Sequence, residues 1–173
     1  MIPFLYLYVF NREQIFILCG ILSIGFLGVD LIRFKFIKLR RLFLKVFGSL
    51  LKGEEQDRKL TGATHLFLSA TIVICLFNRD SVIPALIILS ISDACAAVFG
   101  TIYGQHRLFN KSLEGSLVFF FVSFFIIIVF SDLRIVVGLL ISGLLTLIEV
   151  LPIPVNDNYS IAICGAFIFN MVL

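Results

Sequence analysis

Long apolar runs separated by short polar segments are the feature that most constrains how this chain can fold. They extend over residues 15–30, 60–77, 82–99, 113–130, 135–151 and 159–173. At about 1.5 Å of rise per residue, a helix over each run crosses most of a bilayer core roughly 30 Å thick. Hydrophobic residues make up 60% of the chain and charged residues only 14%, against about 25% charged residues in an ordinary soluble domain. The sequence therefore excludes a water-soluble globule and predicts an all-α, polytopic transmembrane helix bundle.

The six runs predict a single integral membrane domain, residues 1–173, with about six spans and a possible seventh, truncated, at the N-terminus. Basic residues indicate the orientation, because Lys and Arg are retained on the cytoplasmic side. Three of the 14 Lys and Arg residues, Arg12, Arg79 and Arg134, fall on one face. On the opposite face nine fall in segment 31–60, two in segment 101–112 and none in segment 152–158. We therefore expect a multi-pass protein with these three segments in the cytoplasm, in a bacterial plasma membrane or an ER-type membrane.

Residues 31–60 form the most basic part of the chain. From Arg33 to Lys52, Lys and Arg alternate with Leu, Ile and Phe, and no acidic residue interrupts them. This pattern is typical of a basic amphipathic cytoplasmic segment that lies in the membrane interface against anionic lipid headgroups. Cytoplasmic retention of positive charge explains the same residues equally well.

Two acidic residues lie deep within predicted spans, where a carboxylate costs roughly 2.5–3.5 kcal/mol on insertion scales. Asp93 and Glu149 occupy the cytoplasmic parts of their spans at nearly the same depth. The cost of burying each carboxylate and the similar depth of the two residues favour a functional role for the pair. Each residue could also simply mark a helix end. For Asp30, at the end of the first span, we expect only snorkelling or local pairing.

Small residues follow Asp93 at a spacing of four, namely Ala96, Gly100 and Gly104. On a helix such a stripe lets another backbone approach closely, and it is common as a packing motif alone. A carboxylate one turn before a glycine-lined surface also suits a phosphate–magnesium site, since the acid holds the cation and small residues admit the phosphates.

The next polar segment, Asn110-Lys111-Ser112-Leu113-Glu114-Gly115-Ser116, opens the fourth span. Ser112 is placed to cap this helix, whose free N–H groups and positive dipole end would attract an anion beside Lys111. An ordinary interfacial Lys–Glu pair explains the same residues. The segment Asn156-Asp157-Asn158 faces the same side, as a simple turn or as polar ligands of one pocket.

Four segments in this order resemble the family of CTP-dependent lipid kinases that includes dolichol kinase, phytol kinase and the CTP-type diacylglycerol kinase. They are the runs RKLTGATH from Arg58, DACAAVFG from Asp93, KSLEGS from Lys111, and Glu149 followed by NDN from Asn156. The second and third runs are the specific part of the resemblance. It implies transfer of the γ-phosphate of CTP to the hydroxyl of a membrane lipid at the cytoplasmic face.

The resemblance also implies roles for individual residues. Asp93, Lys111 and Glu114 would be catalytic, with Asp93 holding Mg²⁺ or another divalent cation, Lys111 neutralising phosphate charge, and Glu114 orienting Lys111 or a metal. The positions expected to bind the nucleotide are Gly100, Gly104, Ser112, Gly115, Asp157 and Asn158. Arg58, Lys59 and Glu149 would contact substrate or phosphate. The expected partners are CTP, the acceptor lipid and anionic headgroups, without nucleic acid.

Two alternatives to the kinase stay open. A CTP:phosphatidate cytidylyltransferase-like enzyme also uses CTP at an intramembrane acidic site, but the chain lacks the dense C-terminal Lys, Asp and His residues associated with that family. A non-catalytic transporter or scaffold would place polar residues along a path across the membrane, whereas here they gather on one face. The sequence leaves the acceptor open among polyprenol, phytol and diacylglycerol, and it does not fix which acid, if any, serves as the base.

Overall fold

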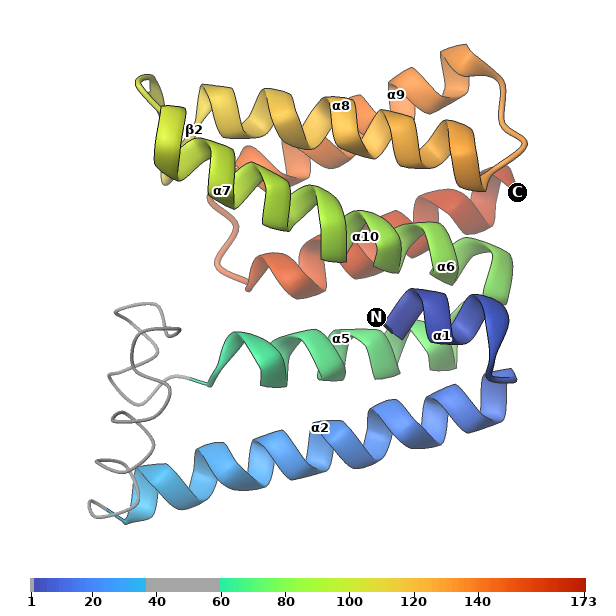
Figure 1. Cartoon of the computed structure of the whole chain (residues 1–173), viewed down its shortest axis with the longest axis vertical. Helices are drawn as coiled ribbons and strands as arrows, with labels where there is room; N and C mark the ends of the chain where they lie inside the picture. Colours follow the sequence, from blue (N-terminus) through green and yellow to red (C-terminus); the bar gives the residue numbers. More distant parts are fainter. Residues whose placement is uncertain (1, 37–59) are drawn as a thin grey trace.

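A computed structural model describes residues 2–36 and 60–173 of the chain (Figure 1). Within these residues nearly all regular structure is helical. Its elements are α1 (Ile2–Tyr8), α2 (Arg12–Lys35), α5 (Gly62–Leu76), α6 (Arg79–Ile87), the π-helical turn η1 (Ile88–Ser92), α7 (Asp93–Tyr103), β1 (Arg107–Leu108), β2 (Lys111–Ser112), α8 (Leu113–Phe130), α9 (Ile135–Val150) and α10 (Asp157–Val172). Most of the basic segment, with Arg58 and Lys59, lies outside the described residues.

The long helices run side by side in alternating directions, as Figure 1 shows. α10 is central, because it packs against α5, α6 and α9, while α8 packs against α7 and α9, and α2 packs against α5. The end of α2, the start of α5 and the segments that join α7 to α8 and α9 to α10 therefore lie at one end of the bundle. We call this end the hairpin end, after the strands β1 and β2 that it contains.

The predicted apolar runs correspond to helices, and the fourth run matches α8 at both ends. One local difference from an all-α fold is the antiparallel ribbon in the polar segment 101–112, where Arg107 pairs with Ser112 and Leu108 with Lys111. Among the described residues, three helices are long and apolar enough to cross a membrane: α2, the continuous helix Arg79–Tyr103, and α8. α5 and α9 are apolar but shorter, with 15 and 16 residues. The structure thus supports a helical membrane protein, and the count of six spans stays a prediction.

The third predicted span contains a π-helical turn that the sequence analysis did not anticipate. This turn, η1, comes directly before Asp93, where regular α-helix resumes as α7. Single π-helical turns widen a helix locally and occur often at functional sites. Here the turn sets the rotation with which Asp93 and the small residues after it face their neighbours.

At the end opposite the hairpin, two arginines bind helix termini. Arg12 donates to the carbonyl oxygens of Ile74 (3.1 Å) and Cys75 (2.8 Å) in the last turn of α5. Arg79 donates to the carbonyl oxygen of Tyr6 near the end of α1, at 2.9 Å. A cation beside the exposed carbonyls of a helix C-terminus satisfies them and complements the helix dipole. These basic residues therefore serve the fold.

The small-residue stripe of α7 forms a close helix contact with α8 near the hairpin end. A Cβ atom added at Gly115 of α8 would lie 2.8 Å from the carbonyl oxygen of Ala96 and 3.2 Å from the Cα atom of Gly100. A Cβ atom at Gly100 would lie 2.6 Å from Ser112 Oγ. The packing role that the sequence left open is therefore present, since backbone meets backbone at this crossing.

We predict that Gly115→Ala lowers the thermal unfolding midpoint in detergent, because overpacking of this kind typically costs about 1–3 kcal/mol. The matched control is Gly143→Ala in α9, where the added Cβ atom would meet only a Phe120 ring carbon at 3.9 Å. Without a clash, this change should leave the midpoint unchanged or raise it, since alanine favours helix over glycine by about 1 kcal/mol. Equal midpoints for the two variants would contradict the close α7–α8 contact.

The predicted orientation is tested by single cysteines in a background whose four native cysteines are replaced by alanine. Asn110→Cys at the hairpin end should react with a membrane-impermeant maleimide only from the cytoplasmic side of sealed vesicles. Asp132→Cys, in the connection between α8 and α9, should react only from the opposite side. Labelling of both cysteines from the same side would overturn the alternating topology.

Candidate functional site

The hairpin end of the bundle contains a cavity of about 1030 Å³. Its walls come from the first turns of α5, α8 and α10, one face of α7, the β-ribbon and the last turn of α9. Most residues that the sequence predicts for the site line this cavity: Asp93, Gly100, Gly104, Lys111, Ser112, Gly115, Glu149, Asp157 and Asn158. Four separate stretches of the sequence are thus brought to one place.

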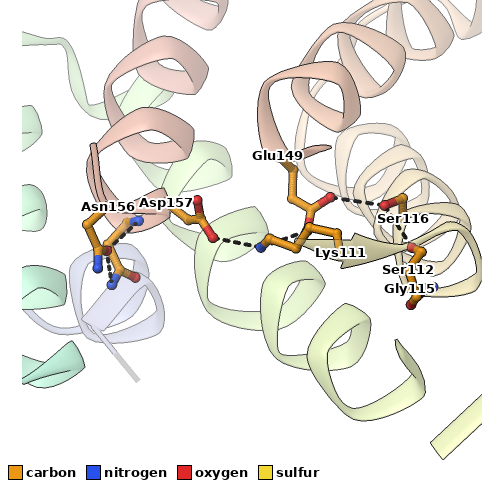
Figure 2. A network of polar contacts seen from close by, with 8 residues as sticks. Lys111, Ser112, Gly115, Ser116, Glu149, Asn156 and Asp157 are labelled. Carbon is orange, nitrogen blue, oxygen red and sulfur yellow. Dashed lines mark hydrogen bonds and ion pairs between the residues drawn. The ribbon is translucent and has the colours of Figure 1, made fainter. Parts of the chain in front are cut away.

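Lys111 lies at the centre of the polar network in this cavity (Figure 2). Its Nζ atom is 2.9 Å from Glu149 Oε1 and 2.6 Å from Asp157 Oδ2. Lys111 comes from β2, Glu149 from the last turn of α9, and Asp157 from the first turn of α10. One ammonium group therefore links the hairpin to two helices that are joined by a short loop.

The Glu149 carboxylate is almost completely buried, with 2% of its side chain exposed. Besides its ion pair with Lys111, it accepts a hydrogen bond from the Ser116 hydroxyl at 3.2 Å. A buried charge requires a partner of opposite charge and further hydrogen bonds, and Glu149 has both. Both oxygens of the acid that the sequence predicts deep in a span thus have a partner.

Burial alone would lower the pKa of Lys111, because it disfavours the charged ammonium. The hydrogen bond to Asp157 and the negative charges of Glu149 and Asp157 outweigh this effect and raise the pKa above its ordinary value. Lys111 therefore carries its positive charge throughout the physiological pH range. A fixed cation in a partly buried position is suited to contact with an anionic ligand.

Three helix N-termini meet at the cavity, each with a side-chain cap. The Thr61 hydroxyl accepts from Thr64 N–H at the start of α5, and Ser112 Oγ accepts from Gly115 N–H at the start of α8, as predicted. Asn156 Oδ1 accepts from Asn158 N–H at the start of α10, at 3.0 Å. Helix N-termini carry positive partial charge and free N–H groups, so their convergence favours negative groups of a ligand.

Asp93 lies at the start of α7 and lines the same cavity. Among residues 2–36 and 60–173, no group of three or more His, Cys, Asp and Glu side chains is arranged to hold a metal ion. Mg²⁺ bound with a nucleotide usually takes only one or two carboxylates, together with substrate phosphates and water. A single carboxylate at Asp93 therefore fits a nucleotide-bound Mg²⁺ better than a metal held by protein ligands alone.

Glu114 is placed differently from the other predicted catalytic residues. Its carboxylate accepts from the backbone N–H of His106 and lies 2.9 Å from His106 Nδ1. This pair fastens the hairpin to the first turn of α8, and Glu114 is absent from the residues described as lining the cavity. The contacts found for Lys111 are with Glu149 and Asp157, whereas Glu114 pairs with His106. The predicted role of Glu114, to orient Lys111 or a metal, stays a prediction.

Asp30 does more than the local pairing expected from the sequence. It pairs with Arg33 at 3.0 Å and is 1% exposed. Its Oδ2 atom also accepts from the Thr61 N–H at 2.8 Å and from the Thr64 hydroxyl at 2.6 Å. Asp30 of α2 thus fixes the first turn of α5, which forms one wall of the cavity. A buried acid opposite two threonines so distant in sequence gives no local signal.

The sequence reasoning also missed two residues at the crossing of α5 and α10. His65 lines the cavity, and its Nδ1 atom lies 3.3 Å from the hydroxyl oxygen of Tyr159. The two rings meet edge to face, with centroids 5.4 Å apart. His65 stands inside the RKLTGATH run of the resemblance, which was the available signal for it.

Comparison with known proteins gives two partial similarities. The chain is 32% identical to an uncharacterized protein of Rickettsia prowazekii over 126 residues, which are 72% of this chain and 61% of that protein. It is 29% identical to CTP-dependent diacylglycerol kinase 1 of Schizosaccharomyces pombe over 103 residues, which are 56% of this chain and 47% of that kinase. The chain thus spans about half to three fifths of the length of these curated relatives.

No protein-family profile matches the chain, and no solved structure matches it significantly. The similarity to the yeast kinase agrees with the resemblance found in the sequence motifs. It supports relationship to the CTP-dependent lipid kinases at the level of the family and suggests a lipid kinase in a membrane.

The ion-pair network predicts unequal effects for substitutions of Lys111 and Glu149. Lys111→Met leaves Glu149 buried without its cation and should destabilise the protein by about 3 kcal/mol. Glu149→Gln should cost less, because Lys111 keeps its contact with Asp157. The double variant Lys111→Met/Glu149→Gln should be more stable than Lys111→Met alone, since it removes the uncompensated charge. Thermal unfolding in detergent measures all three, and additive effects would contradict the pairing.

Proposed function

We propose that the protein is an integral membrane kinase that transfers the γ-phosphate of CTP to the hydroxyl of a membrane lipid at the cytoplasmic face. The observation that carries the proposal is the convergence of Asp93, Lys111 and three helix N-termini on one cavity. These are the groups that phosphoryl transfer requires, because the reaction depends mainly on positioning and on neutralising charge. The similarity to a CTP-dependent diacylglycerol kinase supports CTP as the donor and a lipid as the acceptor.

The charge of the cavity supports a divalent cation in this reaction. The described part of its lining carries three carboxylates, Asp93, Glu149 and Asp157, against two permanent cations, Arg107 and Lys111. A nucleotide triphosphate would add further negative charge, which an accompanying Mg²⁺ neutralises. Asp93 would hold this ion, and the ion would supply electrostatic stabilisation of the transferring phosphoryl group.

Lys111 would contact the phosphates while Glu149 and Asp157 hold its ammonium in place. Because the side chain is anchored on two sides, it loses little further conformational freedom on binding, and this preorganisation favours catalysis. The first turns of α8 and α10 offer N–H groups to the same anion. Gly100, Gly104 and Gly115 line the cavity without side chains, and the first and last keep α7 and α8 close together.

The decisive experiment supplies the purified protein with CTP and a panel of diacylglycerol, phytol and polyprenol in detergent micelles. Label from γ-labelled CTP should appear on one of these lipids, with CDP as the other product. Label from α-labelled CTP, with release of pyrophosphate, would instead identify a cytidylyltransferase. A folded protein that uses CTP with no lipid of the panel would favour the transporter or scaffold.

We expect Asp93→Asn and Lys111→Ala each to reduce transfer by at least about 100-fold, because each removes a charge that acts on the phosphates. The matched control is Asp132→Asn, the same change in an exposed connection at the opposite end of the bundle. It should keep wild-type turnover. If the Asp93 and Lys111 variants were folded and remained active, the assignment of the site would fail.

A further inference from the structure

The helices that form the walls of the cavity are arranged as an arc with one open side. α7 packs against α8, α8 against α9, α9 against α10, and α10 against α5. Among the described elements, α5 and α7 are the two ends of this arc and do not pack closely on each other. Both nevertheless line the cavity, α5 with its first turns and α7 with one face. The described part of the wall is therefore open between α5 and α7.

This opening is limited to the part of the bundle between Asp93 and the hairpin. α6 and η1, which precede Asp93 in the same continuous helix, pack against α10 and close the arc there. Beyond Asp93 the helix continues as α7 and ends next to Gly104, and both residues line the cavity. At about 1.5 Å of rise per residue, the cavity extends roughly 16 Å from the hairpin into the bundle.

α7 carries a second row of cavity-lining residues beside the small-residue stripe that contacts α8. This row is Asp93, Ala97 and Thr101, which follow one another at a spacing of four and so share one face of the helix. Ala97 and Thr101 are exposed, so no described element covers them. The Thr101 hydroxyl donates to the carbonyl oxygen of Ala97 at 2.6 Å, which satisfies it within the helix. The α7 border of the opening is therefore formed by small groups whose hydrogen-bonding needs are met.

The turns of α7 that carry Ala97 and Thr101 also expose large apolar side chains. These are Val98, Phe99 and Ile102. α7 belongs to a continuous helix that is long and apolar enough to cross a membrane. Exposed apolar side chains on such a helix are suited to contact with lipid hydrocarbon. The opening between α5 and α7 therefore lies at a level of the helix that suits lipid and not water.

The cavity changes in character from this opening to the hairpin. The α5 border of the opening is lined by the apolar residues Leu60, Ala63 and Leu66, whereas the hairpin contributes the cations Arg107 and Lys111. A ligand that reaches from one to the other would be apolar at the opening and anionic at the hairpin. The proposed acceptor has a hydroxyl group on a hydrocarbon chain, and moving each methylene of that chain into water costs free energy. An opening towards lipid lets the hydroxyl reach the phosphates while the chain stays in the membrane.

We propose that the acceptor lipid enters the cavity sideways from the membrane, through the opening between α5 and α7, and that its hydrocarbon chain lies against Ala63, Ala97 and Thr101. This inference rests on the proposed kinase function. CTP enters from the hairpin end, so the nucleotide and the acceptor reach the cavity by different routes. The small side chains on α7 leave the space through which the chain passes, and a larger side chain at Ala97 therefore obstructs the lipid without touching the phosphate-binding groups.

The test compares Ala97→Phe with Ala94→Phe. Ala94 belongs to the same helix, is also exposed, and is absent from the described cavity lining, so the same substitution there is a matched control. For each variant, kcat/KM for the lipid that the wild type uses is measured with γ-labelled CTP. The CTP dissociation constant and the unfolding midpoint in detergent are measured on the same preparations.

For Ala97→Phe we expect kcat/KM for the lipid to fall by about tenfold or more, because the ring occupies the path of the chain. The CTP dissociation constant and the unfolding midpoint should stay near wild type, and Ala94→Phe should keep wild-type values throughout. In the wild type, an analogue of the same lipid with a diazirine on its chain should attach to α5 or α7 on irradiation. An excess of the unmodified lipid should suppress this attachment.

The outcomes separate this inference from the function on which it rests. If the wild type transfers γ-label to no lipid of the panel, both proposals fail. If the wild type is active but folded Ala97→Phe keeps kcat/KM within about threefold, only the route of the acceptor fails. Equal losses in Ala97→Phe and Ala94→Phe, a parallel loss of CTP affinity, or suppressible attachment of the analogue only outside α5 and α7 would also overturn it. Should Ala97→Phe unfold, Thr101→Phe and the attachment experiment test the same route.

Discussion

The ion pairs of Lys111 with Glu149 and Asp157 hold together the parts on which the rest of the hairpin end depends. In an apolar bundle, a carboxylate as deeply buried as Glu149 persists only beside a cation and a hydrogen-bond donor, here Lys111 and Ser116. Because the partners come from the hairpin, α8, α9 and α10, satisfying this one charge fixes the relative positions of four elements. The cavity exists between them because their polar ends meet there and their apolar faces pack elsewhere.

The two ends of the bundle use charge differently. At one end Arg12 and Arg79 donate hydrogen bonds to the carbonyl oxygens of helix C-termini, so these two charged groups stabilise the fold. At the hairpin end the helices α5, α8 and α10 present their N-termini, whose first turns are capped but still offer N–H groups to a ligand. The dipoles of these three helices thus add positive electrostatic potential at this end, beside the charges of the side chains. The same alternation of direction that builds the bundle therefore also underlies the proposed binding of a phosphate-bearing ligand.

Much of the fold and of the site could be predicted from local patterns. The apolar runs located the helices, because burial of backbone and apolar side chains in a membrane demands long uninterrupted stretches. The serine cap before α8 follows from short-range chemistry, since its hydrogen bond spans only from Ser112 to Gly115. Asp93 and Glu149 were singled out because charges within apolar runs are costly and need a reason. Lys111 was singled out because it stands beside a predicted helix N-terminus. The pairings of Glu114 with His106 and of Asp30 with α5 were not predictable, because the first depends on how the hairpin folds back and the second on how α2 packs against α5.

The sequence by itself determined the class of protein, the helix positions and most of the side chains that line the cavity, since these depend on composition and on spacing along the chain. Only the tertiary structure decided which of these side chains meet. Asp157 and Lys111 are 46 residues apart, and His65 and Tyr159 are 94 apart, yet each pair is in contact. No local rule relates such positions, because their distance is set by how α5, α9 and α10 pack. The partners of each charge, and with them the chemistry available in the cavity, follow from that packing.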